Sequence, residues 1–199
     1  MPLLAEVLAE QRAETHYPVM WPLPGPVESF LVRRGELAAW VAELGGRVVG
    51  HVAVSDPGDE LGPLWAPATG GAPLGEVSVL FVGSAARGSG VGGLLLDTAV
   101  AWIRERGLAP VLDVAEVNDR ALAVYRHRGW EEVTRTRLSW LPDDAGDLIL
   151  MALPSVRPDA SVGQDRPVAD GVHDGRRHSF MPDPATMAVP EVVRSLAGD

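Results

Sequence analysis

Residues 87–92, Arg-Gly-Ser-Gly-Val-Gly, combine the residue types of an anion-binding helix start. They follow an apolar alternating run at 76–82 and open an amphipathic stretch that ends near Gly107. The first N–H groups of a helix have no intrahelical partner, and the helix dipole places partial positive charge there. Glycines let a phosphate approach the backbone closely, and Arg87 adds a fixed positive charge. The segment therefore predicts a phosphate-binding loop that leads into a helix.

Two other phosphate-binding loops share part of this glycine pattern. Gly88-x-Gly90-x-x-Gly93 satisfies the dinucleotide fingerprint, and Asp113 lies near the expected acidic position. However, residues 83–87 separate the apolar run from the first glycine, and Asp113 falls inside the apolar run at 110–115. A nucleoside-triphosphate P-loop needs a lysine, whereas all 17 basic residues of this chain are arginine. These observations disfavour the dinucleotide site and exclude the P-loop.

A second motif lies one predicted strand further along the chain. Residues 111–117 are typical of a strand, and residues 118–130 are typical of a helix. Asn118 suits the N-cap of that helix and Gly129 suits the position after its last turn. The order is thus strand, glycine-rich helix start, strand and a second capped helix.

The two motifs together resemble those of the GCN5-related N-acetyltransferase (GNAT) superfamily, and the resemblance spans residues 37–153. The first motif is Arg87-x-x-Gly90-x-Gly92, and the second is Asn118-x-x-Ala121-x-x-x-Tyr125-x-x-x-Gly129-Trp130. The resemblance implies a GNAT (acyl-CoA N-acyltransferase) fold, acetyl-CoA as the acyl donor and no metal. It implies that the backbone of Leu80, Phe81 and Val82 binds the pantetheine arm and polarises the thioester carbonyl. It implies a pyrophosphate site at Arg87, Gly88, Ser89, Gly90, Val91 and Gly92. Asn118 is either only the helix cap or also a pantetheine contact.

Acyl transfer to an amine needs a base and an acid. At pH 7 an alkyl ammonium with a pKa near ~10 is almost wholly protonated, so its proton must be removed before attack. Glu76 is the candidate base, because histone-type members carry a glutamate at the matching strand position; the alternative is an exposed charge at a strand start. Strict alternation would point Glu76 and Val82 to one face of the sheet. Tyr125 is the candidate acid for the departing thiolate, and it matches the tyrosine of the superfamily; the alternative is a ring packed beside Leu122.

The acceptor is not identified by the sequence. A small amine, an amino acid, a drug and a peptide amino terminus all stay open. Aromatic residues in the amino-terminal half either line the acceptor site or fill the core; they are Tyr17, Trp21, Trp40 and Trp65. His51 is expected to be structural rather than catalytic, and Asp113 is left unassigned.

The remaining periodicities predict an α/β domain with a mixed, mostly antiparallel sheet, one central parallel junction and flanking helices. Gly45-Gly46 is a strong hairpin signal between two apolar runs. The expected helices lie at 3–14 and 27–34. The expected strands lie at 37–44, 47–54, 75–82, 110–116, 130–140 and 148–153. Residues 55–74, rich in glycine and proline, are expected to form one long loop.

Composition limits the class of protein. Hydrophobic residues make up 46% of the 199 residues and charged residues 22%, which is ordinary for a globular enzyme. No apolar run approaches the ~20 residues of a membrane span, and the amino terminus lacks the pattern of a signal peptide. We therefore expect a cytoplasmic protein without membrane contact. The net charge of −10 argues against nucleic-acid binding, and the absence of cysteine with five scattered histidines argues against a metal centre.

The sequence therefore predicts an acetyltransferase domain at residues 1–153 and a Pro/Gly-rich, mostly disordered tail at 154–199, within which 191–196 could form a short helix. The predicted activity is transfer of an acetyl group from acetyl-CoA to a primary amine by direct attack in a ternary complex. The alternative is a non-catalytic acyl-CoA-binding module or regulator. A homodimer is compatible with either function.

Overall fold

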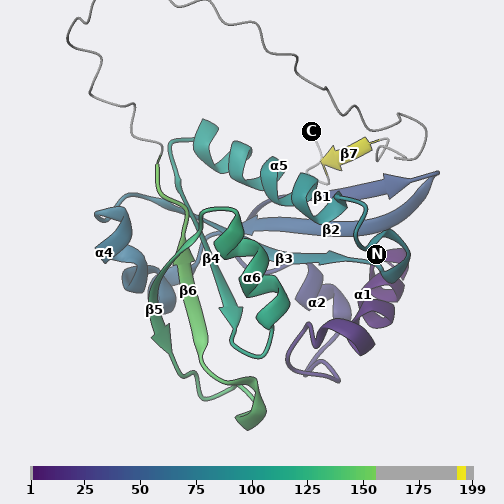
Figure 1. Cartoon of the computed structure of the whole chain (residues 1–199), viewed down its shortest axis with the longest axis horizontal. Coiled ribbons are helices and arrows are strands. Elements are labelled where there is room, and N and C mark those ends of the chain that lie inside the picture. Colours follow the sequence, from purple (N-terminus) through teal and green to yellow (C-terminus); the bar gives the residue numbers. More distant parts are fainter. Residues whose placement is uncertain (1, 156–191, 196–199) are drawn as a thin grey trace, which may run out of the picture.

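A computed structural model describes residues 2–155 and 192–195, and its centre is a mixed β-sheet (Figure 1). The strand order is β5-β6-β4-β3-β2-β1-β7. Among the strands of the described residues, only β3 and β4 run parallel, and the other neighbouring pairs are antiparallel. The strands are β1 (Glu36–Leu44), β2 (Arg47–Ser55), β3 (Leu74–Val82), β4 (Ala109–Ala115), β5 (Glu131–Thr136), β6 (Leu148–Ala152) and β7 (Val192–Ser195). The predicted fold class and its single parallel junction are confirmed.

Helices cover both faces of this sheet (Figure 1). On one face, α5 (Val91–Glu105) and α6 (Asp119–His127) pack over the largest hydrophobic cluster, which includes Trp40, Leu112 and Met151. On the opposite face, α1 (Pro2–Thr15) and α2 (Val27–Leu31) pack against Val41 and Phe81. The helices expected at 3–14 and 27–34 are therefore present, although the second ends at Leu31.

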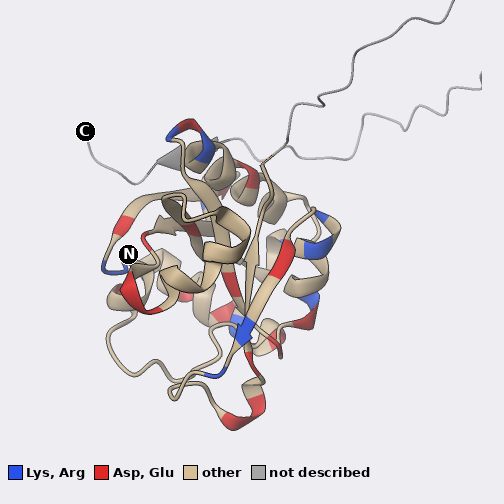
Figure 2. Ribbon diagram, turned by 90° about the vertical axis from the view of Figure 1, so that its left-hand side faces the viewer, with Lys and Arg blue, Asp and Glu red and all other residues tan. Residues whose placement is uncertain are grey.

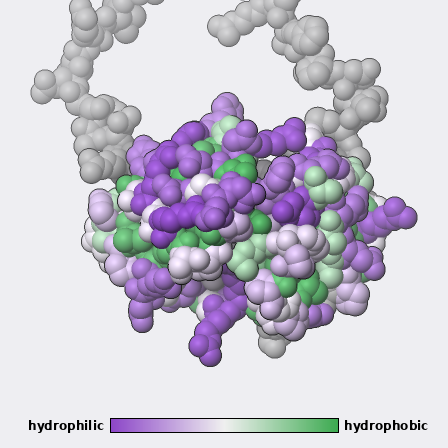
Figure 3. All heavy atoms as spheres, turned by 90° about the horizontal axis from the view of Figure 1, so that it is seen from below, coloured by the Kyte–Doolittle hydropathy of each residue, from purple (hydrophilic) through white to green (hydrophobic). Residues whose placement is uncertain are grey.

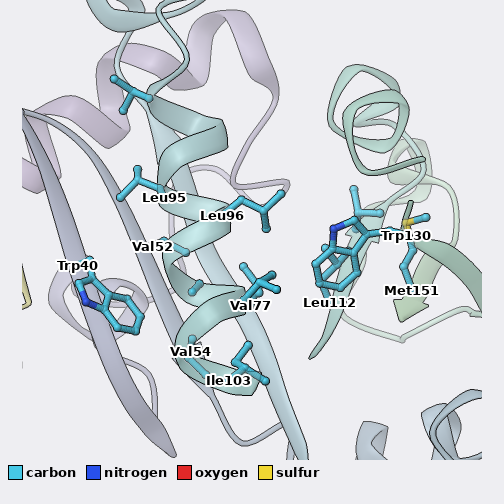
Figure 4. Close-up of a cluster of buried hydrophobic side chains, with 14 of the residues drawn as sticks. Trp40, Val52, Val54, Val77, Leu95, Leu96, Ile103, Leu112, Trp130 and Met151 are labelled. Carbon is cyan, nitrogen blue, oxygen red and sulfur yellow. The ribbon is translucent and has the colours of Figure 1, made fainter. Parts of the chain in front are cut away.

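The packing of α5 fixes where its glycine-rich start lies. Leu95, Leu96 and Ile103 of this amphipathic helix are buried against Val52, Val54 and Val77 of the sheet (Figure 4). Glycine is required beneath the helix, because a Cβ at Gly50 would lie 2.9 Å from Leu95 Cδ1 and one at Gly75 would lie 2.8 Å from Ile103 Cγ1. The bare backbone lets α5 lie close to β2 and β3.

The segment expected to be one long loop contains three short helical turns. These are α3 (Gly58–Leu61), η1 (Gly62–Trp65) and α4 (Ala66–Thr69). Trp65 explains the difference, because its ring is fully buried and its Nε1–H donates to the carbonyl of Met151 at 3.0 Å. The tryptophan fastens the segment to β6, and it forms a third hydrophobic cluster with Leu141 and Leu150.

The hairpin predicted at Gly45-Gly46 joins β1 and β2, and both glycines have positive φ. The closing strand expected at 130–140 ends earlier, at Thr136, and a short turn, η3 (Asp143–Ala145), precedes β6. The helix expected at 191–196 is wrong, because Val192–Ser195 forms β7 and pairs with the edge of β1. Its two β-branched valines favour a strand. Apart from Pro154 and Ser155, the rest of the predicted tail lies outside the described residues.

Candidate active site

The two parallel strands separate at the centre of the sheet. β3 and β4 pair only from Leu74 to Glu76, where Glu76 lies opposite Val111. Beyond this point a bulge places an extra β3 residue opposite β2, and Val79 there has a φ of 49°. This left-handed conformation is unusual for a β-branched residue, and such outliers gather at functional sites. The backbone after Glu76 therefore carries no ladder bonds to β4 and can accept an extended ligand.

The bulge also reverses the alternation of side chains along β3. Val77 and Val82 both pack in the α5 cluster, whereas Val79 and Phe81 pack in the α1 cluster. Glu76 lies on the face opposite its neighbour Val77, so Glu76 and Val82 point to opposite faces. The expectation that they share a face was wrong, because strict alternation ignores an inserted residue.

The glycine-rich loop has the geometry of an anion site. Gly88 and Gly90 have φ of 79° and 86°, a region that favours glycine, and α5 starts directly after Gly90. The N–H groups of the first turn, including those of Val91 and Gly92, have no intrahelical partners. The Arg87 side chain is about a quarter exposed and pairs with Glu14 of α1 and, at 3.5 Å, with Ser84 Oγ. A bound pyrophosphate would compete with Glu14 for this arginine.

Asn118 has a buried polar atom without a partner. It occupies the N-cap position of α6 but makes no side-chain cap hydrogen bond, and its Oδ1 is buried with no donor. A buried carbonyl oxygen without a donor is costly. The pantetheine arm contains amide N–H groups that would satisfy this atom. The unpartnered oxygen therefore fits a pantetheine contact better than a helix cap alone.

A pair of carboxyl groups lies on the face opposite α5. Glu76 is 7% exposed, and Ser55 Oγ donates to its Oε2 at 3.3 Å. Burial and, to a smaller extent, the neighbouring Asp113 carboxylate raise the pKa of Glu76 to about 8, against the lowering effects of Arg33 and Ser55. Burial likewise raises the pKa of Asp113, against a lowering effect of Arg33. A carboxyl with a pKa near neutrality can serve as a general base.

Asp113 is the functional candidate that the sequence left unassigned. Its neighbours Leu112 and Val114 face the α5 cluster, so Asp113 points to the opposite face, as Glu76 does. The sequence signal was a charged residue inside an apolar run. Because β3 and β4 separate between these two carboxyl groups, Asp113 belongs to the same site as the predicted base.

Two tyrosines reach this acidic site from different layers. Burial raises the pKa of Tyr125, and Tyr17 and Asp113 raise it further by electrostatic repulsion. Tyr125 also packs edge to face on Trp130 at 6.1 Å and lies in the cluster of Leu122, so its ring is packed as the alternative expects, and its role as the acid stays a prediction. Burial raises the pKa of Tyr17 to about 12, with Arg33 lowering it. Tyr125 belongs to α6, on the α5 face, and Tyr17 to the α1–α2 connection. Asp113 raises the pKa of both tyrosines, which indicates that both hydroxyls lie near the gap between β3 and β4.

Of the four aromatic residues named as acceptor lining or core, two are buried in the core, Tyr17 packs against the α1 cluster and Trp21 is exposed. Trp40 and Trp65 are 7% and 0% exposed and belong to the core clusters. Trp21 is 44% exposed, and Trp140, on the β5–β6 connection, is 50% exposed. These two connections meet, since Val19 packs in the cluster of Leu141 and Trp65. Hydrophobic residues are visible among hydrophilic ones on this end of the molecule (Figure 3).

A cavity of about 580 Å³ lies between α5, the end of α6 and the end of β6. Arg104 and Arg128 are among its lining residues. Arg128 pairs with Asp97 and places its Nη1 3.1 Å from the point where a Cβ of Gly93 would lie. A guanidinium thus lies beside the first turn of α5, although acidic residues outnumber basic ones along the chain and are spread over the fold (Figure 2).

Within the described residues, no group of three or more His, Asp or Glu side chains is placed to hold a metal ion. The same residues include no helix that is long and apolar enough to cross a membrane.

Comparison with known proteins gives one family match. The model of the acetyltransferase (GNAT) family matches residues 4–130. No curated protein matches the chain.

Several solved structures have a similar fold. The ribosomal-protein-alanine N-acetyltransferase of Brucella melitensis is 25% identical, covers 75% of this chain and 92% of its own, and has a TM-score of 0.53. The ribosomal-protein-S18-alanine N-acetyltransferase of Escherichia coli is 19% identical over 80% of this chain and 92% of its own, with a TM-score of 0.52. Naa50 of Arabidopsis thaliana, solved with the bisubstrate analogue CoA-Ac-MVNAL, is 18% identical over 76% and 91%, with a TM-score of 0.51.

Proposed function

The chain belongs to the acetyltransferase (GNAT) family, and from this premise we propose that it transfers an acetyl group from acetyl-CoA directly to a primary amine in a ternary complex. One observation carries the proposal. The backbone of β3 is unpaired where it separates from β4. The carboxyl groups of Glu76 and Asp113 lie on one face of the sheet at this gap, and Tyr125 approaches it from the other face. An acyl donor in the gap would meet a base on one side and a proton donor on the other.

The residues that would hold acetyl-CoA follow the same gap. Backbone groups of Leu80, Phe81 and Val82 would bind the pantetheine arm as an added strand. Asn118 Oδ1 would accept from a pantetheine amide. The pyrophosphate would bind at the start of α5, to the loop formed by Arg87, Gly88, Ser89, Gly90, Val91 and Gly92. The unpartnered Oδ1 of Asn118 and the first-turn N–H groups of α5, which lack intrahelical partners, support this assignment independently of each other.

Glu76 is the proposed base. The Glu76 carboxylate first takes a proton from the substrate ammonium, directly or through water. The neutral amine nitrogen then attacks the thioester carbon, the C–S bond breaks, and the nitrogen releases its second proton as the amide forms. With a pKa of about 8, roughly one tenth of Glu76 groups are ionised at pH 7. Asp113 raises this pKa because two adjacent carboxylates disfavour each other's charge, so the pair shares a proton.

Tyr125 is the proposed donor to the departing sulfur. Its raised pKa keeps the phenol protonated over the whole working range of pH, so it is always ready to donate. The same rise in the pKa of Tyr125 makes complete loss of the phenol proton costly. Tyr125 therefore stabilises the thiolate first by a hydrogen bond, and complete transfer follows as the released amine proton returns to the site.

The acceptor is proposed to be a primary amine that binds between the α1–α2 and β5–β6 connections. Glu76 and Asp113 would attract its ammonium, and the exposed Trp21 and Trp140 could contact the rest of it. Two of the similar structures are named for alanine acetylation of ribosomal proteins. Peptides with amino-terminal alanine therefore belong in the first set of acceptors, beside small amines and amino acids.

Thiol release with acetyl-CoA and this panel of acceptors tests the proposal. We expect turnover with at least one amine, and its loss in Glu76→Gln and Tyr125→Phe. Glu131→Gln is the matched control, because Glu131 is an exposed glutamate at the start of β5. Acetyl-CoA binding without turnover on any acceptor would favour the non-catalytic module instead. Absence of acetyl-CoA binding would refute the proposed function. Homodimer formation, cytoplasmic location, the absence of nucleic-acid and membrane contact and a domain boundary near residue 153 stay predictions.

A further inference from the structure

His51 is a buried polar residue in an apolar environment. It is 1% exposed on β2, and the surrounding cluster consists of side chains such as Leu8, Ala53 and Phe81. Burial lowers its pKa, so the ring is neutral. A buried imidazole costs free energy unless its nitrogens have partners. An apolar side chain would fill this position at a lower cost, so the imidazole is expected to make specific contacts.

The ring of His51 contacts the bulge of β3 in two ways. Its Nδ1–H donates to the carbonyl oxygen of Val79 at 3.0 Å, and the ring stacks on Phe81 with centroids 5.6 Å apart and planes 26° apart. Val79 has no partner on β2 in the strand register. The carbonyl of the residue with left-handed backbone is thus held by a side chain.

From these contacts we propose that His51 is a positioning residue that aims the N–H of Leu80 at the thioester carbonyl. In a trans peptide the C=O and the following N–H lie in one plane and point in opposite directions. Holding the Val79 carbonyl on the His51 ring therefore fixes the direction of the Leu80 N–H, in a part of β3 that no longer pairs with β4. This inference rests on the proposed function, and it adds the contact that keeps the Leu80 N–H oriented.

The physical reason for such a device is the conformation of Val79. A valine with a φ of 49° would relax toward an extended conformation unless the surroundings prevented it. That relaxation would rotate the Val79–Leu80 peptide plane and turn the N–H away from the gap. A fixed donor stabilises the charge that develops on the carbonyl oxygen, whereas a donor that must reorient does so less well.

The test compares His51→Phe with His51→Asn. Phenylalanine keeps the stacking on Phe81 but has no donor, whereas the Asn amide can place an N–H close to the position of Nδ1. The infrared band of the thioester carbonyl in bound acetyl-CoA, labelled with ¹³C, reports hydrogen bonding to that oxygen. In His51→Phe we expect this band to move toward that of free acetyl-CoA and kcat to fall about 10²-fold, with KM for the acceptor little changed. His51→Asn should recover most of both.

Trp65→Phe is the matched control. It also removes a buried ring N–H donor to a strand carbonyl at 3.0 Å, but that carbonyl belongs to Met151 of β6, which β4 separates from the bulged strand β3. We expect Trp65→Phe to lower stability while leaving the carbonyl band unchanged. If His51→Phe fails to fold, His51→Leu carries the same prediction.

The results separate the two proposals. Normal kcat and an unshifted carbonyl band in the folded His51→Phe or His51→Leu variant would overturn the role of His51 and leave the acetyltransferase proposal intact. Equal effects in Trp65→Phe and His51→Phe would also overturn it, because they would reflect general loss of packing. Failure of the wild-type protein to bind acetyl-CoA would overturn both proposals.

Discussion

Replacing Glu76 by glutamine should make the protein more stable at high pH while it lowers activity. The Glu76 carboxyl is 7% exposed, and its pKa rises from 4.5 to about 8 in the folded state. The folded state therefore holds a proton that the unfolded state releases between these two values. This contribution to stability is complete below pH 4.5 and is lost as the pH rises through 8.

The size of the effect follows from the same two values. A rise from 4.5 to about 8 corresponds to roughly 5 kcal/mol, at ~1.4 kcal/mol for each pH unit. Glutamine has a similar shape and no charge, and it can still accept the hydrogen bond of Ser55. Glu76→Gln should thus resemble the wild type in stability near pH 5 and exceed it by up to about 5 kcal/mol at pH 9.

Urea unfolding of both proteins at pH 5, 7 and 9 measures this difference. Glu131→Gln, an exposed glutamate, should show almost no pH-dependent difference from the wild type. If the difference between Glu76→Gln and the wild type stayed constant from pH 5 to 9, Glu76 would have an ordinary pKa. Burial would then not raise the pKa of Glu76 to a value suited to a general base.

Three further predictions concern the same site. The rate at saturating acetyl-CoA should rise about tenfold from pH 6 to 7 and level off above 8. Asp113→Asn should move this rise to lower pH, because it removes the adjacent negative charge. An unchanged pH profile in this variant would show that Asp113 does not act on the base. Tyr125→Phe should lower kcat about 10²-fold or more with little change in acetyl-CoA affinity measured by calorimetry; unchanged turnover would remove Tyr125 from its role. Gly90→Ala should weaken acetyl-CoA binding and cost about 1–2 kcal/mol in urea unfolding because Gly90 has a φ of 86°, whereas Gly25→Ala, with open space around it, should do neither.

The sequence predicted the parts of the fold that depend on local rules. The hairpin at Gly45-Gly46, the start of α5 after Gly90 and the parallel junction of β3 and β4 follow from glycine conformation and hydrophobic periodicity. The hairpin and the helix start are each encoded within about twenty residues, and the parallel junction lies within one strand–helix–strand unit from Leu74 to Ala115. A local pattern is enough to predict them because no distant contact has to override it.

The features that the sequence did not predict depend on tertiary contacts. No glycine marks the bulge, so strict alternation gave the wrong face for Val82 relative to Glu76. The sequence left open whether Trp40 and Trp65 line the acceptor site or fill the core, and the structure shows that both fill the core. The helical turns between β2 and β3 are fixed by Trp65, whose partner Met151 lies 86 residues away. Asn118 suits a helix cap by type, yet only the structure shows that its oxygen has no partner.

The central claim is that acetyl-CoA lies in the gap between β3 and β4 with its pyrophosphate at the start of α5. An NMR titration that follows the ¹⁵N–¹H signals of the backbone while acetyl-CoA is added tests this most directly. The largest shifts should fall on Leu80, Phe81 and Val82 and on the amides from Gly88 to Gly92. Shifts confined to other parts of the sheet, with both segments unaffected at saturation, would contradict the account.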